Sequence, residues 1–357
     1  MSNASPAPAF LAGKRILVTG GTGFVGRHLV PLLLEAGAAV TVITRSTSKT
    51  SHLPAGTRFL QASLATGEGL AQALGEADLV VHMAALLFGL GWQDYLKANC
   101  RAAQCLASAF REARRQGKAP SRVVFVSSMA CAGPSASPQG RSEKEPAAPV
   151  SAYGWSKLVS ENVLKAGIGD RLVVLRPPII YGSGDLGLLP VYQGLQRGVA
   201  ACPGLARDFP VAAIHVDDMA RAVLLVLSPE ASGTYHLGDG RAYPMAEFYR
   251  EAARALGTQA SIVRLPLWFM GATAALATAF GMLVRLFRKG GRAPNWNLDK
   301  YREAREEGWT ADCSRIREEL GFAPKVSLEE GFRETMEGNY ALGLLKDRRK
   351  DRQKGRR

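Results

Sequence analysis

Tyr153 and Lys157 stand four residues apart, at the start of a stretch with helical periodicity. Residues four apart on a helix share one face, so the two side chains are expected to lie close together. A tyrosine with its usual pKa of about 10 is a poor base at neutral pH, and a nearby ammonium lowers that pKa because it favours the phenolate. Ser128 ends a predicted strand 25 residues earlier. There its hydroxyl can donate a hydrogen bond to the substrate oxygen with which Tyr153 exchanges a proton. The three residues predict general acid–base catalysis at an oxygen atom.

Three glycines, Gly20, Gly23 and Gly26, lie between an apolar run and a helical stretch. Glycine permits the dihedrals of a tight turn, lets a pyrophosphate approach bare backbone, and lets the helix pack close to the strand. The first helical residues, Phe24 and Val25, then offer free N–H groups and the positive end of the helix dipole. This context predicts a dinucleotide-binding loop, and a simple tight turn is the alternative.

The end of the second predicted strand bears on the choice of cofactor. An NAD site usually has an acid there that binds the ribose 2′-hydroxyl, whereas this chain reads Thr44-Arg45-Ser46-Thr47-Ser48-Lys49. Arg45, with Ser46 and Lys49, can instead hold a 2′-phosphate through charge-assisted hydrogen bonds. The sequence favours NADP(H), with NAD(H) as the alternative if Arg45 is only a solvated loop cation.

The elements that must position these residues alternate between short apolar runs and stretches of helical length. Strands alternating with helices imply a parallel sheet covered on both faces. We expect an α/β fold: a Rossmann-type doubly wound parallel sheet with a smaller, discontinuous C-terminal substrate domain. The expected strands are Arg15–Thr19, Val40–Thr44, Arg58–Ala62, Asp78–His82, Arg122–Ser128 and Leu172–Arg176, with Thr234–Leu237 returning to the sheet, and Phe24–Ala36 and Tyr95–Gln116 are expected helices.

The composition also changes along the chain. After Arg176 the alternation gives way to Gly/Pro-rich stretches, so the C-terminal part is expected to form the second domain. The expected division is a flexible leader (1–13), a dinucleotide-binding domain (14–182, with a return near 214–237), a substrate domain (183–213 and 238–340, including an apolar segment, 265–287) and a basic tail (341–357).

Together, the glycine loop, the strand-end serine and the Tyr-x-x-x-Lys pattern resemble the extended short-chain dehydrogenase/reductase family, of the NAD-dependent epimerase/dehydratase type. The resemblance runs from about Lys14 to Tyr340 and includes His82-Met83-Ala84-Ala85, Asn99, Ser127-Ser128, Arg176 to Gly182 and His215-Val216-Asp217-Asp218. It implies an enzyme in which Ser128, Tyr153 and Lys157 form the catalytic triad and Asn99 contributes to a proton relay or to active-site support. It also implies that Asp217 and Asp218 are structural.

The same resemblance implies further cofactor contacts at Ala84, Ala85, Tyr153, Lys157, Pro177, Ile179 and Ile180, the last three beside the nicotinamide. One position departs from the family. After the third strand the family usually has G-D-L, with the aspartate on the adenine, and this chain has Ala62-Ser63-Leu64. Because Ser63 can still hydrogen-bond, Ser63 and Leu64 are expected contacts too.

Two stretches bear on the substrate. The sequence Ser128-Met129-Ala130-Cys131-Ala132-Gly133-Pro134 is similar to the 3β-hydroxysteroid dehydrogenase branch, whereas nucleotide-sugar members commonly read S-x-x-x-Y-G. The stretch from Phe209 to Ile214 has no charge that would grip a diphosphate. We expect an NAD(P)-dependent oxidoreductase that interconverts a secondary alcohol and a ketone on a small hydrophobic substrate, sterol-like or lipid. The alternatives are a nucleotide-sugar epimerase or dehydratase, and a non-catalytic NADP-binding sensor.

The net charge of +14 suggests a nucleic-acid partner at first sight, but its distribution does not. Residues 346–357 carry a net +6 and residues 285–292 a net +4, which leaves +4 for the other 337 residues. Binding to a duplex needs a basic face spread over the folded domain. We therefore expect no nucleic-acid partner.

An uncharged stretch of 20 residues, Leu265 to Val284, lies between Arg264 and Arg285. Its length reaches that of a membrane-spanning helix, and its bulky residues form one apolar stripe. Three interpretations are open: a core or homodimer helix, a peripheral contact with an anionic membrane, and a true span. Arg285, Arg288, Lys289 and Arg292 suit the second, which gives a cytoplasmic protein with peripheral contact on the cytoplasmic face of a membrane.

The cysteines and histidines carry little further information. The five cysteines contain no C-x-x-C pair, which suits a reduced, cytoplasmic compartment. The five histidines are widely spread and form no H-E-x-x-H, so no metal is predicted.

Overall fold

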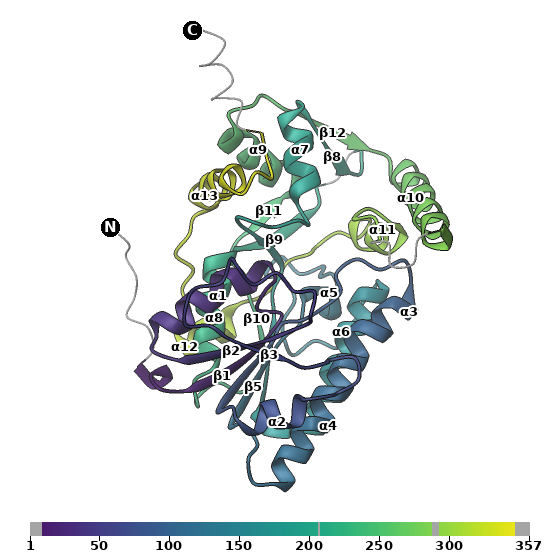
Figure 1. Cartoon of the computed structure of the whole chain (residues 1–357). Helices are drawn as coiled ribbons and strands as arrows, with labels where there is room; N and C mark the ends of the chain where they lie inside the picture. Colours follow the sequence, from purple (N-terminus) through teal and green to yellow (C-terminus); the bar gives the residue numbers. More distant parts are fainter. Residues whose placement is uncertain (1–8, 206–207, 288–292, 347–357) are drawn as a thin grey trace.

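A computed structural model describes residues 9–205, 208–287 and 293–346 of the chain. Its centre is a seven-stranded, wholly parallel sheet with the strand order β10-β6-β5-β4-β1-β2-β3 (Figure 1). The order reverses between β1 and β4, as in a doubly wound sheet. The seven strands are β1 (Arg15–Thr19), β2 (Ala39–Thr44), β3 (Arg58–Gln61), β4 (Leu79–His82), β5 (Arg122–Val126), β6 (Leu172–Arg176) and β10 (Gly233–His236).

Helices cover both faces of this sheet because successive strand residues point to opposite sides. In β1, Ile16 and Val18 pack into one core with the helices α1 (Phe24–Glu35), α8 (Val216–Val226) and α12 (Ser314–Leu320). Leu17 points the other way, toward α2 (Leu70–Gly75), α4 (Arg101–Arg115) and α6 (Ala152–Ile168). The doubly wound α/β fold expected from the sequence is therefore confirmed.

The helix expected over Tyr95–Gln116 is not continuous. It divides into α3 (Trp92–Tyr95), a π-helical segment η2 (Leu96–Cys100) and α4. A π-helical segment shifts the side chains that follow it and is often found at functional sites. Here it carries Asn99. The remaining short helices of this domain are η1 (Ala9–Leu11), α5 (Met129–Ala132) and η3 (Gly169–Arg171).

The second domain lies at the carboxyl ends of the sheet strands (Figure 1). It holds a three-stranded sheet in the order β11-β9-β7 and a two-stranded sheet of β12 and β8, and its core centres on Tyr181, Tyr192, Phe248 and Phe332. Its elements are β7 (Ile179–Tyr181), α7 (Leu189–Gln196), β8 (Val199–Pro203), β9 (Pro210–His215), β11 (Ala242–Pro244), α9 (Met245–Leu256), β12 (Ser261–Leu265) and α13 (Leu328–Ala341).

The chain returns to the main sheet only partly as expected. β10 pairs in parallel with β6, which matches the strand predicted over Thr234–Leu237. β9 instead pairs with β7 and β11, so the residues near 214 belong to the smaller sheet. The apolar run of β9 is buried on both sides, and the sequence alone does not say which sheet buries it.

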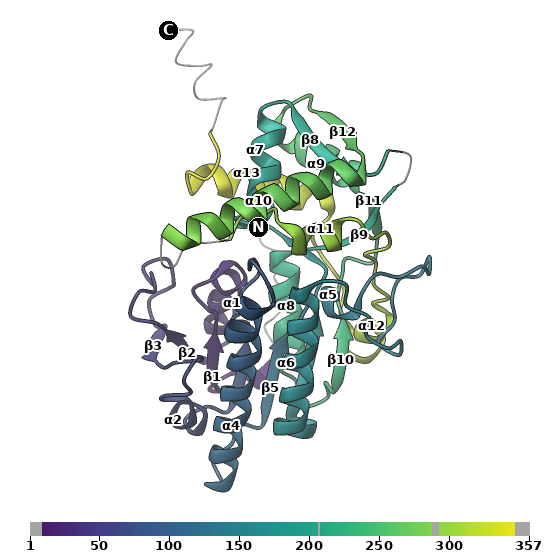
Figure 2. The same cartoon turned by 90° about the vertical axis from the view of Figure 1, so that its right-hand side faces the viewer.

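Two helices lie between the domains. Figure 2 shows α10 (Leu267–Phe287) crossing the molecule, with α11 (Leu298–Ala304) beside it. α11 packs against α10 and reaches the start of α6. The leader residues 1–8, the basic residues Arg288, Lys289 and Arg292, and the tail 347–357 lie outside the described residues.

Candidate active site

The glycine loop is held in place by close backbone packing. Gly20 has φ +76°, and a Cβ there would lie 2.7 Å from the backbone nitrogen of Ala84, after β4. Gly26, in the first turn of α1, lies so close to Gly21 that a Cβ would overlap the Gly21 carbonyl. Gly20 therefore requires glycine both for its positive φ and for its close contact, and Gly26 requires it for its close contact alone.

The start of α1 offers free donors. Gly23 is its N-cap and provides no side-chain hydrogen bond to the helix, so the N–H groups of Phe24 and Val25 are left for another acceptor. The bare backbone of the loop leaves space that any side chain would fill. This cradle fits a dinucleotide pyrophosphate, as the sequence predicted.

At the adenosine end, Arg45 follows β2 with an exposed side chain, and its backbone N–H donates to Ser48 Oγ at 3.0 Å. Ser63 is half-buried after β3, next to Leu64, and its hydroxyl accepts a hydrogen bond from the Thr66 N–H at 3.1 Å. His52 was missed by the sequence analysis. Its ring bonds to the backbone of Thr22 in the glycine loop, and burial lowers its pKa.

A buried polar pair joins β1 to β4 beneath the loop. Thr19 Oγ1 lies 2.6 Å from His82 Nδ1 and also accepts a hydrogen bond from the Ala84 N–H at 3.3 Å. Burial, followed by the charge of Lys157, lowers the pKa of His82 to about 3, so His82 is neutral at pH 7. The pair fixes Ala84 next to Gly20, while Ala85 is exposed.

Ser128 and Tyr153 meet as predicted. Ser128 is the N-cap of α5 and its Oγ accepts a hydrogen bond from the Ala130 N–H at 3.1 Å. Tyr153 lies in the first turn of α6, is only 6% exposed, and lies near enough to the Ser128 hydroxyl for that hydroxyl to influence its pKa. Its ring packs in a small apolar cluster with Tyr95 and Ala130, and Leu86 contacts the same cluster. The two residues predicted to act at the substrate oxygen are therefore neighbours, and the Tyr153 ring lies in an apolar cluster.

Lys157 is fully buried one turn further along α6. Its Nζ donates to the Val126 carbonyl at 2.7 Å and lies 4.5 Å from the centre of the Phe125 ring. Burial lowers the pKa of Lys157 to about 8. Burial, followed by the charge of Glu303, raises the pKa of Tyr153, and hydrogen bonding to Ser128 only partly offsets that rise. The lowering of the Tyr153 pKa by Lys157 stays a prediction.

Asn99 is buried and links three elements. It exchanges two hydrogen bonds with the backbone of Leu86, at 2.7 and 3.1 Å, and its Nδ2 donates to Ser156 Oγ at 3.0 Å. It thereby ties the loop after β4 to α6. This contact gives Asn99 the support role implied by the resemblance, and its part in a proton relay stays a prediction.

The segment expected beside the nicotinamide follows β6. Pro177 is buried and its carbonyl accepts a hydrogen bond from the Met129 N–H at 2.8 Å, which fixes it against α5. Ile179 and Ile180 begin β7 and are half-buried. Pro177 is thus joined directly to the short helix that follows Ser128.

Three functional candidates on α11 were missed by the sequence analysis. Asp299 accepts hydrogen bonds from the N–H groups of Ala152 and Tyr153, at 2.6 and 3.1 Å, and so caps α6. Lys300 Nζ lies 4.4 Å from the centre of the Tyr153 ring and 2.9 Å from Glu303 Oε2. The only signal in the sequence is Asn297, which suits the N-cap of a helix. It does not indicate that Asp299 binds the backbone of Tyr153, 146 residues earlier in the chain.

Further along the face of α6 that carries Tyr153 and Lys157 lies a buried ion pair. Arg176 donates two hydrogen bonds to Glu161, at 2.9 and 2.7 Å, and Cys131 Sγ donates to the same carboxylate at 3.0 Å. The hydrogen bonds and charge of Arg176 hold the pKa of Glu161 below its usual value against the effect of burial. A buried pair that is fully hydrogen-bonded fixes geometry more than it adds stability. It holds α6 against β6.

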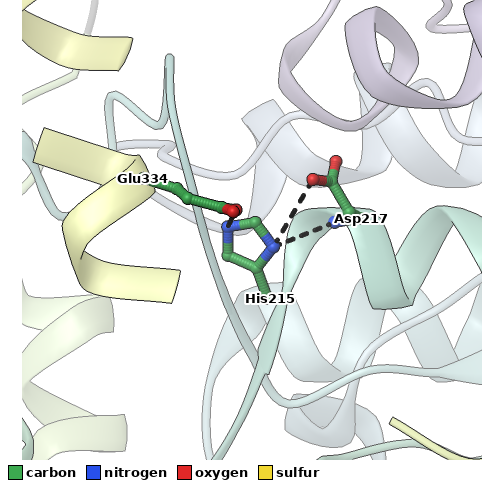
Figure 3. Close-up of side chains that lie close together, drawn as sticks. All are labelled: His215, Asp217 and Glu334. Carbon is green, nitrogen blue, oxygen red and sulfur yellow. Dashed lines mark hydrogen bonds and ion pairs between the residues drawn. The ribbon is translucent and has the colours of Figure 1, made fainter. Parts of the chain in front are cut away.

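One further cluster, His215, Asp217 and Glu334, has the side chains of a cation site. Figure 3 shows the two carboxylates at different edges of the His215 ring: Asp217 Oδ2 lies 3.7 Å from Nδ1, and Glu334 Oε2 lies 4.0 Å from Nε2. Each carboxylate therefore pairs with a different ring nitrogen, and we assign no cation to this cluster. Asp217 instead bonds to His28 of α1 at 2.7 Å.

Asp218 holds two parts of the chain together. Its buried carboxylate accepts hydrogen bonds from the backbone N–H groups of Lys325 and Val326, at 2.9 and 3.0 Å, and pairs with Arg221. The carboxylate thereby ties α8 to the chain that leads into α13. This agrees with the structural role implied by the resemblance.

Comparison with known proteins supplies independent findings. The model of the NAD dependent epimerase/dehydratase family matches residues 16–238. A ceramide reductase of Caulobacter vibrioides is 30% identical over 338 residues, which cover 92% of this chain and 96% of that protein. A 4-hydroxy-2-methyl-3-oxo-4-farnesyl-3,4-dihydroquinoline-1-oxide ketoreductase of Stigmatella aurantiaca is 28% identical over 325 residues, which cover 89% and 94%.

A solved structure is also similar. The UDP-glucose 4-epimerase of Thermotoga maritima, in complex with UDP-glucose, matches with a TM-score of 0.71 and 23% identity, over 93% of this chain and 100% of that one. At this identity the likeness shows the fold alone.

Proposed function

The chain belongs to the NAD-dependent epimerase/dehydratase family, as its resemblance to the extended short-chain dehydrogenase/reductases predicted. From this premise we propose that it interconverts a ketone and a secondary alcohol on an apolar, lipid-like molecule. The observation that carries the proposal is the placement of Tyr153, which is buried in an apolar cluster beside the half-buried Ser128, with the buried Lys157 one turn further along the same helix.

Each residue has a defined part in reduction. Bound NAD(P)H supplies the hydride that reaches the carbonyl carbon. Tyr153 donates its phenolic proton to the carbonyl oxygen, and the raised pKa of Tyr153 keeps that proton in place until the oxygen gains charge. Ser128 donates a hydrogen bond to the same oxygen. Lys157 supplies positive charge that stabilises the phenolate formed, and oxidation runs these steps in reverse.

The apolar surroundings of Tyr153 favour a lipid-like substrate. Leu86, Tyr95 and Ala130 pack with its ring, with the Lys300 ammonium as the charged neighbour, and the loop after β4 continues through Leu87 and Phe88 without a charge. A ceramide reductase and a ketoreductase of a farnesyl compound are similar over most of their length, and both names describe reduction of a molecule with a long apolar part. These relatives support the substrate class without naming the substrate.

A defined set of compounds tests this proposal. The protein is incubated with NADPH or NADH and, separately, a 2-alkyl-3-oxoalkanoate, a 3-oxosteroid, a ceramide bearing a ketone, and UDP-glucose. We expect a product heavier by two hydrogens from at least one of the three ketones and no change in UDP-glucose. Turnover of none of these ketones by a protein that binds the cofactor would contradict the proposal and favour the sensor alternative.

The family also contains epimerases, so an epimerase is the second candidate. An epimerase keeps its cofactor through a full redox cycle and returns it to the starting state. Conversion of UDP-glucose to UDP-galactose without net oxidation of added NAD(P)H would establish that activity. Tightly bound NAD released on denaturing the purified protein would support it.

The preference for NADP(H) rests on Arg45. The end of β2 has no acid that would repel a 2′-phosphate, and the guanidinium of Arg45 is exposed there. Arg45→Ala should lower kcat/KM for NADPH by about 10-fold, the effect of losing one charge-assisted contact, and leave kcat/KM for NADH unchanged. Lys118→Ala, which removes a cation far from the loop, is the control. An equal loss with both cofactors would assign Arg45 to general folding.

A further inference from the structure

The helix α10 is the longest apolar helix in the described part of the chain. By length and composition it could cross a membrane, yet only 22% of its most apolar stretch is buried. Trp268, Leu276, Phe280 and Leu286 are 73%, 72%, 64% and 81% exposed. A helix that is apolar on all sides is normally buried, and exposed apolar surface of this extent marks an interaction site.

The other face of α10 is fixed to the protein. Its buried positions, Met270, Ala274, Thr278 and Gly281, recur every three or four residues and so form one stripe. Thr278 Oγ1 accepts a hydrogen bond from the Leu298 N–H, the first of α11, at 2.9 Å. A true span would separate α10 from α11 and remove this contact, and the Asp299 cap on the helix of Tyr153 depends on α11.

The C-terminal end of α10 is anchored as well. Arg285 donates two hydrogen bonds to Asp94 of α3, both 2.8 Å long. An apolar groove of about 390 Å³ lies here, lined mainly by Leu90, Trp92, Met282 and Leu286 around that ion pair. Tyr95, the last residue of α3, packs against the Tyr153 ring with the ring centres 5.9 Å apart. The exposed face of α10 therefore borders the catalytic part of the molecule.

We propose that the exposed face of α10, formed by Trp268, Phe269, Leu276, Phe280, Leu283, Leu286 and Phe287, lies in the surface of an anionic lipid bilayer with the helix parallel to the membrane. The charge of the chain supports a lipid surface over a second copy. The five residues that follow α10 in the sequence include three bases and no acid, so one end of the face adjoins positive charge that complements anionic headgroups.

The proposal is tested by flotation of the full-length protein with vesicles, without any activity readout, so that its outcome is independent of the proposed reaction. One vesicle contains phosphatidylcholine mixed with phosphatidylglycerol, and the other contains phosphatidylcholine alone. The wild type should float with the mixed vesicles, more weakly at high salt. Leu276→Glu/Phe280→Glu should bind them at least about 100-fold less, because two large apolar side chains lose their insertion.

The controls separate docking from folding and from self-association. Phe59→Glu makes the same change at an exposed position on β3, in the other domain, and should float like the wild type. Trp268→Ala, a milder change on the α10 face, should reduce flotation while its thermal unfolding matches the wild type. Retention of binding by the double variant, or failure of the wild type to float, would overturn the proposal. Light scattering that shows a dimer broken by the double variant, without flotation, would assign the face to a second copy.

Discussion

The two halves of the active site are built in different ways. The cofactor half is made of backbone: Gly20 and Gly26 bring a loop, a helix and a strand end so close that no side chain fits between them. The predicted catalytic half is made of side chains from distant parts of the chain: Tyr153 lies near Ser128, the N-cap of α5, and its N–H donates to Asp299 of α11. A cofactor in the first half would be recognised by the shape of the backbone, and a reaction in the second half would depend on the placement of single polar atoms.

This difference predicts how each half fails. A backbone cradle tolerates no added atom, so a small substitution should disturb both the loop and the stability of the domain. A network of buried side chains can lose one member and remain folded, while the atom that it positioned moves away from its working geometry. Variants in the two halves should therefore separate cofactor binding from turnover.

The largest effect is expected from Tyr153→Phe, which removes only the hydroxyl. Turnover should fall by a factor of about 100 to 10,000, because the proton donor is lost, and the affinity for NADPH should stay within about 3-fold of the wild type. Steady-state rates and fluorescence titration of NADPH measure the two effects. Tyr95→Phe, at a neighbouring ring in the same cluster, is the control. Turnover near the wild-type rate would remove Tyr153 from the chemistry.

Gly26→Ala tests the cofactor half, which is built from backbone. Its Cβ would overlap the Gly21 carbonyl, so either the loop or α1 must move. We expect a loss of about 1 to 3 kcal/mol in the free energy of unfolding and at least about 10-fold weaker NADPH binding. Gly75→Ala, at a helical glycine of α2 whose Cβ would meet only ordinary contacts, is the matched control. Wild-type cofactor affinity in Gly26→Ala would show that the cradle does not depend on this contact.

Asp299→Ala should produce a smaller and more selective effect. It leaves the N–H groups of Ala152 and Tyr153 without their acceptor, at a cost of about 0.5 to 2 kcal/mol in the free energy of unfolding. Because the start of α6 then loses its anchor, kcat should fall by about 10-fold while the Kd for NADPH changes little. Asp299→Asn retains one acceptor oxygen and should recover part of the rate. An equal loss of kcat and of affinity for NADPH would assign Asp299 to general folding.

The same contrast explains how much could be predicted from the sequence. The strands, the glycine loop and the positions of Tyr153, Lys157 and Ser128 in the fold could be predicted because each pattern spans a few residues or one strand and helix. Asp299, Lys300 and Glu303 could not be found, since their role depends on α11 packing against α6, and that contact is set by tertiary structure. The break of the Tyr95–Gln116 helix at η2 was also missed. It accompanies the two hydrogen bonds between Asn99 and the Leu86 backbone, which are tertiary contacts that the helical pattern does not show.

Lys157 tests the catalytic half through the pH dependence of stability, without a readout of turnover. Burial lowers the pKa of Lys157 to about 8 from the usual 10.5, so its charged form is less stable in the folded protein than in the unfolded chain. Between these two values the unfolded chain holds a proton that the folded protein has released, and stability rises with pH, by at most about 1.4 kcal/mol per pH unit.

Lys157→Met lacks this dependence. Its stability relative to the cofactor-free wild type should therefore fall as the pH rises from about 8 to 10, measured by urea denaturation at each pH. Lys165→Met, at a half-exposed lysine on the same helix, should show no such trend. A stability difference between Lys157→Met and wild type that stays constant over this range would mean that Lys157 is not held in a desolvated site.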